Sequence, residues 1–416
     1  METLLSFLCP PLGLPIGLVG LNNRKQNWKK YIFLIALFVA VLAYAYEPTG
    51  NTDLIRYFAK VERYKNAPIS SVFSLEFSSR KENLVLFELI CWVIAKIGDV
   101  HLLPFFSAFF TYYIGLYLTY DIWTNDERPF RSGACLFYVI CLLLSLHFFN
   151  IVNSIRNVLA FALIALAAYR DIIKRKFNIG TILLYIIPLF LHTSSLLFII
   201  ARLLSSVKGK KFFGICLATA LSNPILQLIS PIVLKGGVPD NIVGGLFYNL
   251  VYKSDRYFAY TSTSGYAAVY ARTTTYLRIL YIMLMLLILF FDWQNLKLIR
   301  SENNGTVEVA AYEKWIHFSM LMALLTLSCS TMLMPEYWRF ANSTILVSAP
   351  SVVMMINHPS NRFTQVFKWV FFIFSFGIFS LWMYVFMVSN FELNSFILKP
   401  WVSSPIIMLI KDLFLL

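Results

Sequence analysis

Residues 153–177 read NSIRNVLAFALIALAAYRDIIKRKF, an apolar stretch with polar groups at one end and a basic cluster at the other. This arrangement is typical of a helix in a membrane, with the basic loop on the cytoplasmic side. The composition extends the interpretation to the whole chain, because 59% of the 416 residues are hydrophobic and 13% are charged. Water-soluble domains carry about 25% charged residues. The segment and the composition together predict an all-α, polytopic integral membrane protein.

Similar apolar runs recur along the chain. They lie at about 4–20, 31–46, 84–98, 102–120, 133–151, 157–169, 179–207, 212–234, 273–291, 315–334, 340–356 and 365–389. Because a helix needs about 20 residues to cross a bilayer, the pattern predicts about 12 transmembrane helices in a single transmembrane domain, residues 1–416.

The run at 84–98 is short for a span and carries Glu88 and Lys96, so we interpret it as a helix on the outer membrane surface. The strongly basic loops then all fall inside, as the positive-inside rule requires. These loops hold Arg24, Lys25, Lys29 and Lys30; Arg128 and Arg131; Arg170, Lys174, Arg175 and Lys176; Arg202, Lys208, Lys210 and Lys211; Lys297, Arg300 and Lys314; and Arg362 with Lys368. Topology therefore accounts for the formal charge of +14, and we expect a lipid bilayer and no nucleic acid as partner.

This topology leaves two large segments on the outer side of the membrane. They are residues 47–101, with interfacial helices, and the loop 235–272. In the first, Thr52 can cap a helix. The residues expected on one face of that helix are Asp53, Arg56, Tyr57 and Lys60. The second mixes Gly, Tyr and Ser/Thr, which suits sugar binding or an ordinary irregular loop. Its Arg256 lies in the string RYFA at 256–259, which also occurs at 56–59. A four-residue match is expected by chance in a chain with so many aromatic residues, so we infer no internal repeat.

The run at 179–207 is too long for one ordinary span and is interrupted by Pro188 and by the polar residues 192–195. Proline removes a helix hydrogen bond, and irregular backbone is tolerated at membrane depth where it is buried in protein or lines a cavity. We expect two short helices that fold back at His192 on the outer side. His192 is then either a hydrogen-bonded packing residue or a catalyst.

Arg156 is the candidate anion-binding residue, since it stands between Asn153 and Asn157 where the chain turns back at a membrane boundary. A guanidinium fork can hold phosphate or pyrophosphate oxygens bidentately. The polar residues expected along one helical stripe beside it are His147, Asn150, Ser154 and Asn157. Polar groups in a span usually face a cavity, which favours a functional role. The alternative is a snorkelling interfacial arginine.

Further candidates lie on the same side. Asp53 opens a helix beside Arg56 and Glu88 lies in an apolar run, and each is a candidate general base or a structural carboxylate. Glu336 and Arg339, three residues apart in MPEYWRFAN, could bind substrate or form an interfacial ion pair.

Several familiar patterns are missing from the sequence. There is no GxxxxGK[ST] phosphate loop, no HExxH and no CxxC pair, so nothing supports nucleotide hydrolysis or zinc chemistry. All six cysteines lie in apolar runs, and we interpret them as reduced packing residues. We therefore expect no cofactor and no metal.

The order of these elements resembles the EpsG family of bacterial polysaccharide polymerases, which are Wzy-like proteins. The resemblance rests on GNTDLIRYF, ELICWVIAKIGD, NSIRNVLAFALIALAAYRDIIKRKF and LLYIIPLFLHTSSLLFII. It covers about residues 40–205 and also the region of Arg339. The positions that match the family pattern are Asp53, Tyr57, Arg156 and His192, whereas Asn157 replaces the usual glutamine.

The resemblance implies a glycosyltransferase of the C type in the bacterial inner (cytoplasmic) membrane, acting at its outer, periplasmic face. Such an enzyme joins oligosaccharide repeat units carried on undecaprenyl pyrophosphate. Its expected partners are this lipid-linked oligosaccharide and a chain-length regulator protein. The expected substrate-binding residues are Arg156, Asn157, Asn153, Arg56, Tyr57, Arg339, Glu336 and Arg256, and the expected catalytic residues are Asp53, Glu88 and His192.

Other classes of protein remain open from the sequence. A flippase for lipid-linked oligosaccharide would also need many spans and a cationic cavity. Flippases are commonly built from two similar halves, and residues 1–208 show no correspondence with 209–416. A ligase that moves finished polymer to another acceptor, or an acyltransferase that decorates the glycan, is the third alternative.

Overall fold

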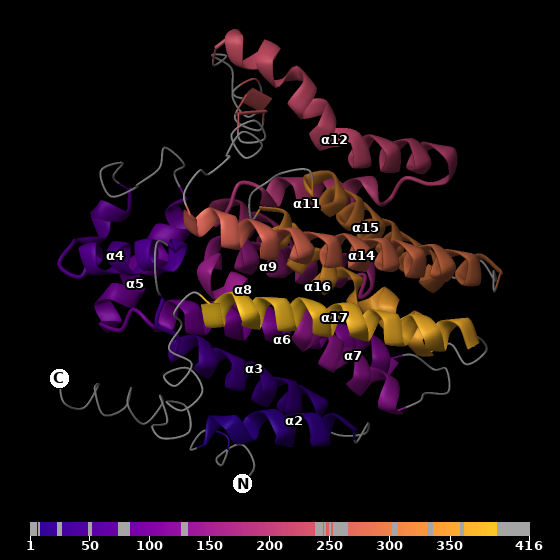
Figure 1. Ribbon diagram of the computed structural model, residues 1–416, viewed down its shortest axis with the longest axis horizontal. Coiled ribbons are helices and arrows are strands. Elements are labelled where there is room, and N and C mark those ends of the chain that lie inside the picture. Colours follow the sequence, from indigo (N-terminus) through magenta and orange to yellow (C-terminus); the bar gives the residue numbers. More distant parts are fainter. Residues whose placement is uncertain are drawn as a thin grey trace.

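The computed structural model describes residues 6, 9–22, 27–48, 52–73, 84–125, 132–237, 244, 247–248, 251–252, 265–301, 307–330, 336–357 and 362–388. Within these ranges every regular element is a helix, and most of the long helices run side by side as a bundle (Figure 1).

The α-helices are α2 (Gly13–Asn22), α3 (Trp28–Tyr44), α4 (Asp53–Tyr64), α5 (Val85–Ile97), α6 (Leu102–Asn125), α7 (Ser132–Ser145), α8 (Phe148–Asn153), α9 (Ile155–Ile172), α10 (Ile179–Ile186), α11 (Ser195–Leu204), α12 (Gly209–Lys235), α14 (Gly265–Ser301), α15 (Val307–Cys329), α16 (Glu336–Asn357) and α17 (Arg362–Val388). Three short 3-10 helices accompany them: η1 (Pro10–Leu12), η2 (Ile69–Phe73) and η3 (Ile187–Phe190).

Helix α16 lies in the core of the bundle. It packs against α6, α7, α9, α14, α15 and α17, and its described side chains are nearly all buried. A helix that is covered on all sides carries apolar residues around its whole circumference, here interspersed with small Ser and Ala that allow close approach. Helix α16 therefore fixes the positions of the helices that surround it.

The lengths and apolar composition of the described helices indicate that this is a membrane protein. Four of them contain segments long and apolar enough to cross a bilayer, at 102–124, 209–235, 275–300 and 366–384. On α12 the large side chains Phe213, Leu228 and Ile232 are exposed, as lipid contact requires. The number of about 12 spans stays a prediction, because the other helices are shorter or carry more polar residues.

Helices α4 and α5 pack against each other at one end of the bundle, on the left of Figure 1. The buried side of α4 carries Leu54, Tyr57, Val61 and Tyr64 at helical spacing. Helix α5 has 13 residues, and Gly98 ends it in the left-handed conformation, with φ at 95°. A helix of this length is too short for a span, in agreement with the prediction for 84–98.

The break predicted within 179–207 is confirmed. Helix α10 ends at Ile186, the 3-10 helix η3 contains Pro188, and α11 begins at Ser195. Both short helices pack against α9. Asp171 near the end of α9 bonds Tyr185 of α10 at 3.2 Å and Arg202 of α11 at 2.8 Å, so the chain returns to the same end of α9.

Two expectations were wrong. The run 133–151 is interrupted, since α7 ends at Ser145 and the backbone N–H of Asn150 donates to His147 Nδ1 at 3.0 Å, which starts α8. The expected polar stripe is therefore spread over two helices and their caps. The loop expected at 235–272 is shorter, because α14 already begins at Gly265. Most of the remaining loop lies outside the described residues.

Candidate functional site

A polar centre lies where α4, α8, α9 and α16 meet. The carboxylate of Asp53, the first residue of α4, accepts a hydrogen bond from Arg339 Nη2 of α16 at 3.0 Å. Arg339 Nε also donates to Ser154 Oγ at 3.0 Å, at the junction of α8 and α9. Ser154 in turn donates to Asn150 at 2.9 Å. Arg339 thus joins three parts of the chain that are far apart in sequence.

Asp53 has a second, weaker contact. Arg56 Nη1 reaches its Oδ1 at 3.3 Å, and the Arg56 side chain is 55% exposed. Because exposed ion pairs contribute little, Oδ1 is the oxygen of Asp53 that can change partners. Thr52 occupies the N-cap position of α4 as predicted, but its side chain makes no capping hydrogen bond.

Arg156 lies on the first turn of α9 beside Tyr57 and Phe87. Its Nε donates to the Tyr57 hydroxyl at 3.2 Å, and its guanidinium lies 5.7 and 5.4 Å from the ring centres of Tyr57 and Phe87. These two rings meet edge to face at 5.0 Å. Burial raises the pKa of Tyr57 above its ordinary value, and the nearby Arg156 offsets only part of that rise. Tyr57 is therefore a neutral phenol that accepts from Arg156 and keeps its own proton.

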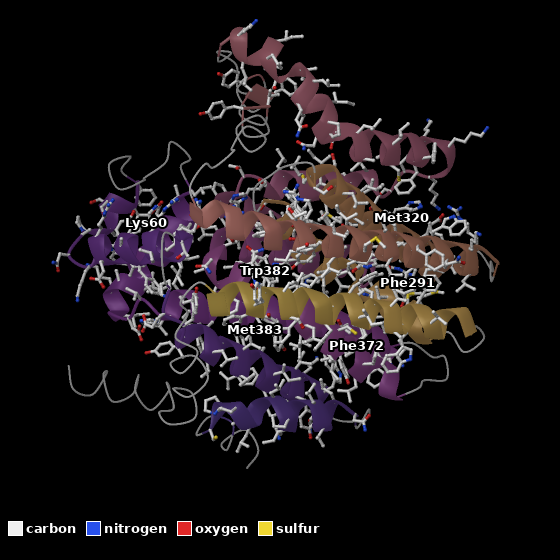
Figure 2. The ribbon with its side chains drawn as sticks, in the orientation of Figure 1. Lys60, Phe291, Met320, Phe372, Trp382 and Met383 are labelled. Atoms are coloured by element: carbon white, nitrogen blue, oxygen red, sulfur yellow. The ribbon has the colours of Figure 1, made fainter. Side chains whose placement is uncertain are left out.

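Glu88 is held by α4. Lys60 forms an ion pair with its Oε1, and the Tyr64 hydroxyl donates to its Oε2 at 3.0 Å. The Lys60 and Glu88 side chains are only 11% and 5% exposed. Figure 2 shows Lys60 at the left end of the bundle and Trp382 nearer its middle. A buried carboxylate with both oxygens bonded is suited to joining two helices rather than to accepting a proton.

Three asparagines beside the arginines each have one buried amide atom that no described residue bonds. Among the described residues, Asn150 Nδ2, Asn153 Oδ1 and Asn157 Nδ2 have no hydrogen-bond partner. Asn153 uses its own Nδ2 to reach Phe149 O at 2.8 Å. Because buried polar atoms are normally bonded, such a group next to two arginines indicates a place where a polar ligand binds.

Three predicted residues are not brought to this centre by any described contact. His192 is buried beside the Phe161 ring, with 6.0 Å between ring centres, and its Nδ1 accepts from the Ser194 backbone N–H at 3.2 Å. Arg256 lies outside the described residues, and so does the side chain of Glu336, the first residue of α16.

Arg278 of α14 is a cation that the sequence interpretation missed. Its guanidinium lies 5.4 Å from the ring centre of Tyr337, which is two residues before Arg339 on α16. The Arg278 Nε is buried and, in the described part of the chain, has no hydrogen-bond partner. The available signal was an arginine inside the apolar run 273–291, because charges within spans are rare and usually functional.

The fold and the site define a helical membrane protein with a part-buried arginine–carboxylate centre at one end of its bundle. Comparison with known protein families matches residues 28–398 to the EpsG family, and the chain belongs to this family. The resemblance seen in the sequence is thereby confirmed, and it extends well beyond residues 40–205. No curated protein sequence and no solved structure matches the chain. Membership in this family indicates a function of the polysaccharide-polymerase type.

Proposed function

We propose that the protein is a polymerase that joins undecaprenyl-pyrophosphate-linked oligosaccharide repeat units into a surface polysaccharide at the outer face of the bacterial inner membrane. The observation that supports it best is the joint position of Arg156, Arg339 and the uncommitted Nδ2 groups of Asn150 and Asn157 at one end of the bundle. Guanidinium and amide N–H groups stabilise the charge that develops on a departing pyrophosphate.

In the proposed reaction, a hydroxyl oxygen of the acceptor unit attacks the anomeric carbon of the growing glycan. The bond from that carbon to the pyrophosphate oxygen breaks, and undecaprenyl pyrophosphate leaves. Asp53 Oδ1 takes the hydroxyl proton, because its contact with exposed Arg56 is weak enough to be replaced by the acceptor. Asp53 Oδ2 meanwhile holds Arg339 toward the leaving group.

Arg278 provides a third cation for the lipid-linked donor. It lies on a membrane-spanning segment beside Tyr337, so it is placed to reach a phosphate whose polyprenyl chain stays in the bilayer. In this account the arginines, and no metal ion, neutralise the leaving group, and EDTA should leave the rate unchanged.

Deletion of the gene in the bacterium that makes the protein tests this proposal against the alternatives. A polymerase predicts that surface glycan is reduced to single repeat units and that the cloned gene restores long chains. A flippase predicts that lipid-linked units accumulate at the cytoplasmic face. A ligase predicts that long polymer accumulates on the lipid carrier. Either of the last two outcomes would overturn the proposal.

A further inference from the structure

A buried carboxyl group lies in the bundle away from the arginine centre. Asp292 of α14 is fully buried, and neither of its carboxyl oxygens has a hydrogen-bond partner of normal geometry among the described residues. The hydroxyls of Ser319 on α15 and Ser351 on α16 interact with this carboxyl group, and both serines are fully buried. Neither Oγ forms a hydrogen bond of normal geometry within the described ranges. Three helices thus bring a carboxyl group and two hydroxyls to one place.

Helix α16 is perturbed at this position. Pro350, next to Ser351, has no N–H and so interrupts the backbone hydrogen bonding of α16. Near it, neighbouring helices donate to two carbonyls of α16: Asn295 Nδ2 reaches Ser351 O at 2.7 Å, and Trp315 Nε1 reaches Val347 O at 3.1 Å. These bonds join α14 and α15 to α16 at this level.

The donor set selects the kind of ligand. Carboxyl and hydroxyl oxygens are hard donors that favour alkali and alkaline-earth cations over transition metals. The site has one carboxylate, and none of the described lysines or arginines contributes to the electrostatic environment of Asp292. A single negative charge is balanced by a monovalent cation, whereas Ca²⁺ sites usually supply several carboxylates.

We propose that Asp292, Ser319 and Ser351 bind a monovalent cation of the size of Na⁺. The cation neutralises Asp292 and joins α14, α15 and α16. Asp292 is 14 residues from Arg278 along α14, so the cation site lies roughly 20 Å from Arg278. The cation therefore stabilises the helices that carry Arg278 and Arg339 without touching the substrate.

The test is thermal unfolding of the purified full-length protein in detergent, in NaCl and in choline chloride at equal ionic strength. A ligand that binds only the folded state raises its stability. We expect NaCl to raise the Tm by several degrees with a saturable dependence, KCl to raise it less, and Asp292→Asn to abolish the response. Ser375→Ala is the matched control, because Ser375 is an equally buried serine whose hydroxyl bonds to its own helix at Phe371 O. This variant should respond as the wild type does.

An equal Tm in the three salts, as a buried water or a permanently protonated carboxyl would give, overturns the proposal, and so does an undiminished response of Asp292→Asn. If Asp292→Asn fails to fold, Ser319→Ala and Ser351→Ala decide the question. Each should raise the NaCl concentration for a half-maximal Tm shift severalfold, and unchanged midpoints in both would overturn the site.

Discussion

At the scale of single residues, the contact between Asp53 and Arg339 holds the polar centre together. The two residues are 286 positions apart, and their side chains are 24% and 14% exposed. Sequence spacing identified Asp53, Arg156 and Arg339 as separate candidates, because each has an unusual local setting. It could not pair Asp53 with Arg339, since a contact over that separation is determined by how the helices pack.

Arg156→Lys tests the role of the guanidinium. Lysine keeps the positive charge but loses the planar fork, so binding of pyrophosphate should weaken although the protein still inserts. Loss of a transition-state contact of about 3 to 4 kcal/mol slows transfer roughly a hundred- to a thousandfold. We expect short glycan on gels of cells that make equal amounts of the two proteins. If the variant gave glycan ladders of wild-type length, Arg156 would be a snorkelling interfacial arginine and not a pyrophosphate-binding residue.

Arg278→Gln should raise the stability of the protein and lower its activity. Among the described residues the buried Arg278 Nε has no hydrogen-bond partner, so removal of this charge from the span should raise the Tm of the purified protein. Loss of a charge-assisted hydrogen bond of about 1.5 to 3 kcal/mol should slow transfer roughly ten- to a hundredfold. Arg278→Lys is the control that keeps the charge. A lower Tm with normal activity would contradict the assignment.

At the scale of elements, the pairing of α4 with α5 depends on the buried Lys60–Glu88 ion pair. The short apolar helix at 84–98 was predictable because its length and its two charges are local properties. The end of α7 was not, because it depends on the capping contact of His147 with Asn150 and on packing of the His147 ring against Trp382, at 3.4 Å between centres.

Lys60→Met should loosen both helices. It leaves a buried carboxylate unpaired, which costs about 3 to 5 kcal/mol, and faster amide hydrogen exchange in α4 and α5 reports the change. The double variant Lys60→Met with Glu88→Met should recover most of the protection, because an apolar pair of similar size needs no ion pairing. Lys96→Met is the matched control, since Lys96 donates to the Lys65 carbonyl at an exposed position and lies over the Trp92 ring, without a contact to Glu88 in the described part of the chain. Unchanged exchange in Lys60→Met would show that the pair is dispensable.

At the scale of the whole molecule, composition predicted a helical membrane protein because hydrophobic content is a property of the entire chain. The number of spans could not be obtained in the same way. The apolar run 133–151 is broken by contacts that no hydropathy average contains, whereas Pro188 and the polar residues 192–195 made the break in 179–207 predictable. Orientation rests on the distribution of Lys and Arg, and it can be measured directly.

Single cysteines in a cysteine-free protein test the topology. Ile97 at the end of α5 and Lys210 at the start of α12 are both exposed positions. If 84–98 lies on the outer surface, a membrane-impermeant maleimide should label Ile97→Cys in intact cells and label Lys210→Cys only after the cells are opened. The reverse pattern would place the arginine centre at the cytoplasmic face and contradict the proposed reaction.

The proposed function requires that this chain alone elongates lipid-linked repeat units through its arginine centre. The most direct measurement adds the purified protein to an undecaprenyl-pyrophosphate-linked repeat unit in the presence of EDTA, and follows glycan length on a gel. We expect a ladder of polymer with the wild type and almost none with Arg156→Lys. Repeat units left unextended by a folded wild-type protein, or an equal ladder from the lysine variant, would contradict it.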